Sequence, residues 1–226
     1  MKVLLFDIDG TLVLSGGAGL RAMNRAFADL YDLPDAFAGI QLAGRTDRAI
    51  LQDGLARYQL AWSPEAEEIF KQRYFELLPE EMLLPAAGKR IMPGVLPLLE
   101  ILSQRPGLHL GLLTGNWRTS GYLKLAEFGL DRYFTFGAFA DDSGAREELL
   151  PFAVTRFAAV HGRRPLPHEV YVIGDTPHDI QCARPHGAVA VGVAAAAHSA
   201  ADLAVHHPDY LLEDLQDTAA ALQVLG

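Results

Sequence analysis

The sequence contains little cysteine, which restricts the classes of protein it can belong to. Its single cysteine, Cys182, excludes an intramolecular disulfide and suits a reducing compartment. No neighbouring residue indicates an activated thiol, so Cys182 is predicted to be a small apolar residue on a helix.

Positive charge is also scarce. The chain carries 19 Lys and Arg against 28 Asp and Glu, for a formal net charge of −9. This balance argues against general affinity for nucleic acid or for an anionic membrane. If the protein binds phosphate, local cations or a metal ion must supply the attraction.

Long apolar runs are absent, so no transmembrane span is expected. The apolar run at residues 3–6 is interrupted by Asp7 and Asp9, and no cleavage site follows it, which argues against a signal peptide. These features predict a cytoplasmic protein.

Half of the 226 residues are hydrophobic, enough for a sizeable core with an insertion. Apolar runs at 3–6, 108–113, 170–173 and 188–193 read as buried strands. Strands that alternate with helical patterns predict an α/β fold, a parallel sheet with helices on both sides. The helical faces are Val95, Leu98, Leu99 and Leu102; Leu123, Ala126, Glu127 and Leu130; and Leu149, Phe152, Ala153 and Phe157.

Residues 15–85 contain no convincing strand and instead repeat a helical spacing. We therefore predict a core domain formed by 1–14 and 86–226, with a helical domain of 15–85 inserted after the first strand. The apolar positions at that spacing are Leu20, Met23, Phe27, Leu30 and Tyr31; Ile50, Leu51, Leu55 and Tyr58; and Ile69, Phe70, Tyr74, Leu77 and Leu78.

Polar groups follow the predicted strands, and the carboxyl ends of parallel strands are where ligands bind in such sheets. Asp7 and Asp9 end the first strand and point to the same side of an extended segment. One carboxylate can attack phosphorus while the other transfers a proton. A lone Asp-x-Asp is more often a solvated turn, but this pair directly follows an apolar strand.

The second strand ends in Thr114-Gly115-Asn116. A hydroxyl and a backbone N–H at a helix start can hold phosphate oxygens. An ordinary cap, with Asn116 at the start of the next helix, explains the same residues equally well.

The third strand ends in a segment that contains Asp175 and Asp179, with Pro177 suited to the first helical turn. Acidic side chains there complement a helix dipole, but with Asp7 they would also supply the hard oxygen ligands that Mg²⁺ prefers. Arg146 is the candidate cation for the phosphoryl oxygens, although a single Arg is more often solvated.

Together these residues resemble the haloacid dehalogenase superfamily. The segment Asp7-Ile8-Asp9-Gly10-Thr11 matches its first motif, Thr114 its second, and Gly174-Asp175-Thr176-Pro177-His178-Asp179 the GDxxxD form of its fourth. The match spans essentially the whole chain. The resemblance implies a Rossmann-like core, with the helical insert as a C1 cap.

The resemblance also implies roles for these residues and a Mg²⁺ cofactor. Asp7 would be the nucleophile and a metal ligand, and Asp9 the general acid/base with its backbone carbonyl on the metal. Asp175 would bind the metal directly, and Asp179 would act nearby or through water. Thr114 would bind phosphate. Gly115 and Asn116 are further substrate-binding candidates.

One motif departs from the family pattern. The third motif is usually a Lys, but no Lys follows Lys124, so Arg146 is the best substitute. The insert resembles those of phosphoglycolate-phosphatase-like members. There Arg45 would meet a second anionic group of the substrate or form a salt bridge at the first turn of the next helix. His178 is either a pocket residue or an exposed helix residue.

These expectations favour a phosphatase that acts through an aspartyl-phosphate on a small phosphorylated metabolite, as a monomer or homodimer. A β-phosphoglucomutase-like sugar phosphomutase is the alternative. Asp9 argues against a dehalogenase, because relatives with that chemistry lack the second Asp. A phosphonatase would need a Schiff-base Lys in the cap, and neither Lys71 nor Lys89 lies near the expected substrate loop. A non-catalytic binding protein on the same fold is the remaining alternative.

Overall fold

A computed structural model describes all residues, 1–226. Its centre is a six-stranded sheet with the order β5-β4-β1-β6-β7-β8, and every neighbouring pair is parallel. The strands are β1 (Lys2–Phe6), β4 (Leu108–Leu113), β5 (Gly137–Ala138), β6 (Val170–Gly174), β7 (Val189–Val193) and β8 (Tyr210–Leu212). The predicted α/β class is therefore confirmed.

The four predicted strands are all present, as β1, β4, β6 and β7. They form the middle of the sheet, where burial on both faces requires continuous apolar runs. The edge strands β5 and β8 were not predicted. Each has only two or three residues, and Tyr210 and Leu211 of β8 are exposed, so neither leaves a recognisable pattern.

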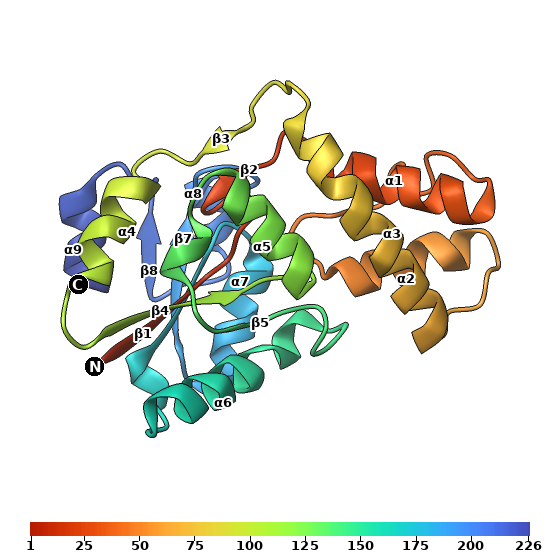
Figure 1. The fold of residues 1–226 in the computed structure, drawn as a ribbon. Coiled ribbons are helices and arrows are strands. Elements are labelled where there is room, and N and C mark those ends of the chain that lie inside the picture. The colour runs from red at the N-terminus through yellow and green to blue at the C-terminus, as the bar shows by residue number, and fades with distance from the viewer.

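Helices cover both faces of the sheet (Figure 1). Alternate residues of β1 divide between two cores: Leu4 and Phe6 lie in one, Val3 and Leu5 in the other. The first core includes residues of α4 (Val95–Ser103), α5 (Arg118–Glu127) and α9 (Thr218–Leu225). The second includes residues of α6 (Leu150–His161), α7 (Pro177–Ala183) and α8 (Ala200–Ala204).

Cys182 is buried in the second core on α7, as predicted. Two predicted helical faces are partly wrong. Phe152 on α6 is 41% exposed. On α5 the buried residues are Ser120, Gly121, Lys124 and Leu125 rather than Leu123, Ala126 and Glu127. Ser120 and Lys124 of α5 are buried because they bond to the carboxylates of Asp47 and Asp9, which inverts the usual hydrophobic signal.

Between residues 15 and 85 the chain forms three helices, α1 (Ala18–Tyr31), α2 (Asp47–Arg57) and α3 (Pro64–Leu83), and no strand. Thr46 and Ser63 cap α2 and α3, each accepting a hydrogen bond from a backbone N–H. The predicted apolar positions form one cluster that includes Phe27, Leu51 and Phe70, except that Ile69 is 54% exposed. We call residues 15–85 the helical segment.

Two short antiparallel strands connect the helical segment to the rest of the chain. They are β2 (Val13–Leu14) and β3 (Arg90–Ile91), and they pair Leu14 with Arg90. In Figure 1 the segment projects to one side of the sheet from this connection. Short 3-10 helices complete the fold: η1 (Asp131–Tyr133), η2 (Arg146–Glu148), η3 (Pro167–Glu169) and η4 (Arg184–His186).

We call residues 1–14 and 86–226, which carry the sheet, the sheet domain. Trp117, which precedes α5, joins the helical segment to it. Its ring is fully buried, with its centroid 5.7 Å from that of Tyr74 and 6.1 Å from that of Phe70. Its indole N–H donates to Glu67, which also accepts from Arg48. Burial of a large aromatic ring with a satisfied N–H favours a fixed docking geometry.

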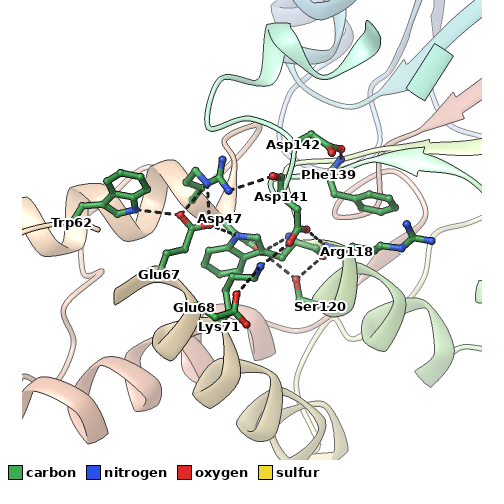
Figure 2. Close-up of polar contacts among 12 residues, drawn as sticks. Asp47, Trp62, Glu67, Glu68, Lys71, Arg118, Ser120, Phe139, Asp141 and Asp142 are labelled. Atoms are coloured by element: carbon green, nitrogen blue, oxygen red, sulfur yellow. Dashed lines mark hydrogen bonds and ion pairs between the residues drawn. The ribbon is translucent and has the colours of Figure 1, made fainter. Parts of the chain in front are cut away.

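Further polar contacts lie at this junction, where Figure 2 labels Asp47 and Lys71 of the helical segment and Ser120 and Asp141 of the sheet domain. Asp47 accepts hydrogen bonds from the backbone N–H of Trp117 at 3.0 Å and from the Ser120 hydroxyl at 3.1 Å. Lys71 of α3 pairs with Asp141 at 2.7 Å. The helical segment therefore contacts the sheet domain at a polar cluster as well as through β2 and β3. None of the helices has the length and apolar character that crossing a membrane requires.

Candidate active site

The carboxyl ends of β1, β4 and β6 open into a cavity of about 550 Å³ that the helical segment covers. Of the predicted site residues, all but Asp179 line this cavity, and a carboxylate oxygen of Asp179 lies within 4.8 Å of those of Asp7 and Asp175. The lining contributed by the sheet domain includes Asp7, Asp9, Thr114, Gly115, Asn116, Lys124, Arg146 and Asp175; the lining from the helical segment includes Leu20, Met23, Leu42, Arg45, Ile50 and Tyr74.

Three carboxylates form the centre of the site. Oxygen atoms of Asp7, Asp175 and Asp179 all lie within 4.8 Å of one another, and the three residues are buried. Asp7 is held by a hydrogen bond from its backbone N–H to the carbonyl of Ile173, which continues the β1–β6 pairing. Gly10 has φ +87°, and a Cβ there would overlap the Asp175 carboxylate, so only glycine lets the chain turn this close to it.

Burial and mutual repulsion shift the titration of these groups. Burial, followed by the negative charge of Asp179 and Asp9, raises the pKa of Asp7 to about 6, although Arg146 opposes the shift. Burial and the charges of Asp7 and Asp179 raise the pKa of Asp175 to about 7. Carboxylates gathered at such an energetic cost fit a divalent cation, and oxygen donors are the ligands that Mg²⁺ prefers.

Arg146, in η2, supplies positive charge beside this cluster. Its Nη2 lies 3.1 Å from Asp7 Oδ1, donates to Asp179 Oδ1, and lies 3.3 Å from the carbonyl of Leu113. Burial acts to lower the pKa of Arg146, but Asp179 and Asp7 outweigh it and raise that pKa. Its Nε has no hydrogen-bond partner. A fully buried guanidinium is thus aimed at the predicted nucleophile from the position at which a Lys was expected.

Asp179 is bonded more completely than Asp7 or Asp175. Its Oδ2 accepts from the backbone N–H of Thr176 at 3.0 Å and from the Thr176 hydroxyl at 2.7 Å, while Oδ1 accepts from Arg146. Asp179 therefore completes the capping box of α7 through Oδ2 and orients Arg146 through Oδ1. Asp175 keeps more free lone pairs, because it accepts only from the Thr11 hydroxyl and the backbone N–H of Ala197, both at 3.2 Å.

Thr114 and Asn116 form the opposite wall. Thr114 Oγ1 accepts hydrogen bonds from the side-chain and backbone nitrogens of Asn116, at 2.8 and 3.3 Å. Its own hydroxyl proton is not donated to any protein acceptor, so it is available to a ligand in the cavity. The Asn116 side chain, by contrast, is saturated by Thr114, Asp9 and Lys124.

Lys124 is the site residue that the sequence reasoning did not identify. Its ammonium lies 2.6 Å from Asp9 Oδ2 and 2.6 Å from Asn116 Oδ1. Burial acts to lower the pKa of Lys124, but Asp9 and Asp47 outweigh it, so that pKa is raised. The available signal was that Ser120 and Lys124 lie four residues apart, on one face of the helix that follows Thr114-Gly115-Asn116.

Two predicted residues mark the contact with the helical segment. Gly115 accepts a hydrogen bond at its carbonyl from the backbone N–H of Asp47, at 2.7 Å, and a Cβ there would overlap the carbonyl of Arg45. Arg45 lines the cavity and pairs with Asp53 of α2 at 2.6 Å. Arg45 therefore forms a salt bridge with the next helix, but its partner Asp53 lies beyond the first turn, where the bridge was expected. His178 is half-buried beside Gly44 and does not line the cavity.

This fold and site belong to a known class. The family model for haloacid dehalogenase-like hydrolases matches residues 4–184. The chain therefore belongs to the haloacid dehalogenase-like hydrolase family, as its motifs predicted.

Individual relatives within this family cover the whole chain. A phosphoglycolate phosphatase from Synechococcus elongatus is 30% identical over all of this chain and 99% of its own length. The pyrophosphatase PpaX from Bacillus pumilus is 29% identical over 97% of this chain and 95% of its own. A solved structure of a predicted phosphoglycolate phosphatase from Haemophilus somnus has a TM-score of 0.70 at 22% identity, covering 99% and 98% of the two chains, and shows the shared fold.

Proposed function

We propose that this protein is a Mg²⁺-dependent phosphatase that hydrolyses small phosphorylated metabolites through a phosphoaspartate at Asp7. The observation that carries the proposal is the convergence of Asp7, Asp9, Arg146 and Asp175 in one cavity, with the Asp179 carboxylate clustered beside Asp7 and Asp175. Relatives of full length that are named phosphatases support it.

Each residue has a chemical role that its position supports. A carboxylate oxygen of Asp7 attacks phosphorus, and Asp9 gives a proton to the leaving oxygen. Asp9 then takes a proton from water as the water oxygen attacks phosphorus and releases Asp7. Arg146 and the free hydroxyl proton of Thr114 hold the phosphoryl oxygens, whose charge must be stabilised in phosphoryl transfer.

The carboxylate cluster would hold the metal. Asp7 and Asp175 would be direct ligands with the backbone carbonyl of Asp9, while Asp179, which already accepts hydrogen bonds from Thr176 and Arg146, would act through water. Bound there, Mg²⁺ would offset the charge of the carboxylates and of the phosphoryl group.

The helical segment, residues 15–85, is proposed to act as a C1 cap that excludes water and selects the substrate, and residues 1–14 and 86–226 form the core domain. Relatives act, by name, on phosphoglycolate and on pyrophosphate, so both compounds are candidate substrates. We place the enzyme in the cytoplasm as a monomer or homodimer without nucleic-acid partners.

The experiment is phosphate release from 2-phosphoglycolate, pyrophosphate, sugar phosphates and nucleoside monophosphates, each with Mg²⁺ and with chelator. Asp7→Asn is expected to lose activity by at least about 10³-fold while its circular dichroism stays unchanged. The matched control is Asp32→Asn, an exposed residue with φ 58° that asparagine also adopts. Retained activity in Asp7→Asn would contradict the proposal.

The same panel tests the phosphomutase alternative. A mutase would return an isomerised sugar phosphate and need a bisphosphate, whereas a phosphatase releases inorganic phosphate alone. No contact in the cavity favours the mutase, and the curated relatives reported above are both named phosphatases.

A further inference from the structure

Lys124 is a buried cation of the cavity to which the reaction above gives no role. Its side chain is only 6% exposed. The ammonium donates to Asp9 Oδ2 and to Asn116 Oδ1, both at 2.6 Å. Hydrogen bonds with an ionised partner are short and strong, so this head group is firmly placed.

Two donors converge on a single oxygen of Asp9. Asn116 Nδ2 donates to Oδ2 at 2.8 Å, beside the 2.6 Å contact from Lys124. The other oxygen, Oδ1, accepts no hydrogen bond from the protein, and the Asp9 side chain is 41% exposed where it lines the cavity. Because Oδ2 is occupied twice, the rotation of the carboxyl group is fixed and Oδ1 is the oxygen left to carry a proton.

The helical segment covers the Lys124–Asp9 pair. A Cβ built on Gly19 of α1 would lie 3.3 Å from Lys124 Nζ and 3.5 Å from the Tyr74 hydroxyl of α3. An exposed lysine–carboxylate pair is mobile and contributes little. Under α1 and α3 the Lys124 side chain is withdrawn from water, so its ammonium is held against Asp9 Oδ2, while Asp9 stays open to the cavity.

We infer that Lys124, together with Asn116, is a positioning residue that turns Asp9 Oδ1 toward the leaving group; this inference rests on the proposed phosphatase activity. The proton on Oδ1 passes to the leaving oxygen as its bond to phosphorus breaks and the bond from Asp7 forms. Lys124 offsets the negative charge that this transfer leaves on Asp9. In the second step Asp9 takes a proton from the attacking water as the bond between Asp7 and phosphorus breaks.

The test compares leaving groups that need a proton with one that does not. An alkyl phosphate requires protonation of its leaving oxygen, whereas p-nitrophenyl phosphate releases a stable anion. General acid catalysis typically contributes about 10²–10⁴-fold. We expect Lys124→Met to lower kcat/KM by about 100-fold for the best alkyl ester of the wild type and by less than about tenfold for p-nitrophenyl phosphate. Lys124→Arg should recover part of the alkyl activity.

Two further variants complete the design. Asn116→Ala removes the second donor to Oδ2 and should show the same selective loss, which keeps the test decisive if Lys124→Met does not fold. Lys71→Met removes another lysine at the boundary with the helical segment, one that pairs with Asp141 outside the cavity. It should leave the ratio of alkyl to aryl activity unchanged.

The outcomes distinguish the role of Lys124 from the phosphatase activity itself. Equal losses on both esters in Lys124→Met and Asn116→Ala, or no loss on the alkyl ester, would overturn the role of Lys124 while leaving the phosphatase intact. No hydrolysis of any ester by the wild type would overturn the proposed function itself.

Discussion

The carboxyl ends of the strands, here called the sheet edge, and the helical segment face the same cavity but contribute different chemistry. The sheet edge supplies carboxylates, a guanidinium and a hydroxyl that bond to one another, as Asp7, Arg146 and Asp179 do. The helical segment supplies mainly apolar side chains, and its cation, Arg45, is already paired with Asp53. In the proposed mechanism the reacting groups therefore all lie in the sheet domain, and the helical segment is proposed to provide shape and exclusion of water. The predictions below test that division.

The largest contrast is expected between two arginines that line the same cavity. Arg146→Met should lower kcat/KM by about 10²–10³-fold, because it removes charge directed at the phosphoryl group and leaves Asp7 and Asp179 unpaired. Arg45→Met should cost less than about tenfold and act mainly on KM, since its charge is neutralised by Asp53.

Steady-state kinetics on the best substrate measure both effects, with Arg146→Lys as the conservative control. That variant should keep part of the activity, because the charge remains although the fork geometry is lost. Equal losses in Arg146→Met and Arg45→Met would remove the distinction between the two regions.

The second prediction concerns the metal-free protein. The pKa of Asp7 in the folded state, about 6, and that of Asp175, about 7, lie above the ordinary aspartate pKa of 3.8, so the folded state binds more protons than the unfolded state in this interval. The contribution of these groups to the free energy of unfolding therefore falls as pH rises from about 4 to about 7.

Mg²⁺ should reverse this loss, so its addition should raise Tm more at about pH 8 than at about pH 5. Thermal denaturation with Mg²⁺ and with chelator measures both effects. Asp175→Asn removes one of the titrating groups and should weaken the dependence on pH and on Mg²⁺ together. If Mg²⁺ raised Tm by the same amount at both pH values, the assignment of the carboxylate cluster as the Mg²⁺ site would be contradicted.

The smallest effects are expected where the helical segment meets the sheet domain (Figure 2). Asp47→Ala should destabilise the fold by about 1–3 kcal/mol, since it leaves the Trp117 N–H and the Ser120 hydroxyl with one acceptor fewer in a buried position. Lys71→Met should cost at most about 1 kcal/mol, because its partners Asp141 and Glu68 are partly exposed.

Denaturant unfolding of the two variants ranks these contacts. A larger loss in Lys71→Met than in Asp47→Ala would mean that the outer ion pair, rather than the buried carboxylate, holds the segment in place.

Sequence reasoning was most successful where one strand end carries one chemical signal. Asp7, Thr114 and Asp175 each follow an apolar run directly, and parallel pairing of β1, β4 and β6 brings them to one edge. Arg146 required the family resemblance as well, because no local pattern distinguishes it from a solvated arginine. The catalytic and metal-binding roles themselves remain predictions.

Lys124 was missed because its burial depends on residues that are remote in sequence. Asp9 lies 115 residues before it, and α1 and α3 cover it from the helical segment. When Leu123, Ala126 and Glu127 are taken as the buried face of the helix, Lys124 falls outside that face and is predicted to be exposed to solvent. The exposed positions of Ile69 and Phe152 are the converse case, since apolar side chains at the margin of a helical face satisfy the spacing without being buried.

The central claim is that Asp7 is phosphorylated during turnover, and chemical trapping tests it most directly. The enzyme would be quenched during hydrolysis of its best ester and reduced with borohydride, which converts an acyl phosphate to an alcohol, followed by peptide mass spectrometry. The account predicts homoserine at position 7, formed only with substrate and Mg²⁺. Turnover without modification of Asp7, or modification of a different carboxylate, would contradict it.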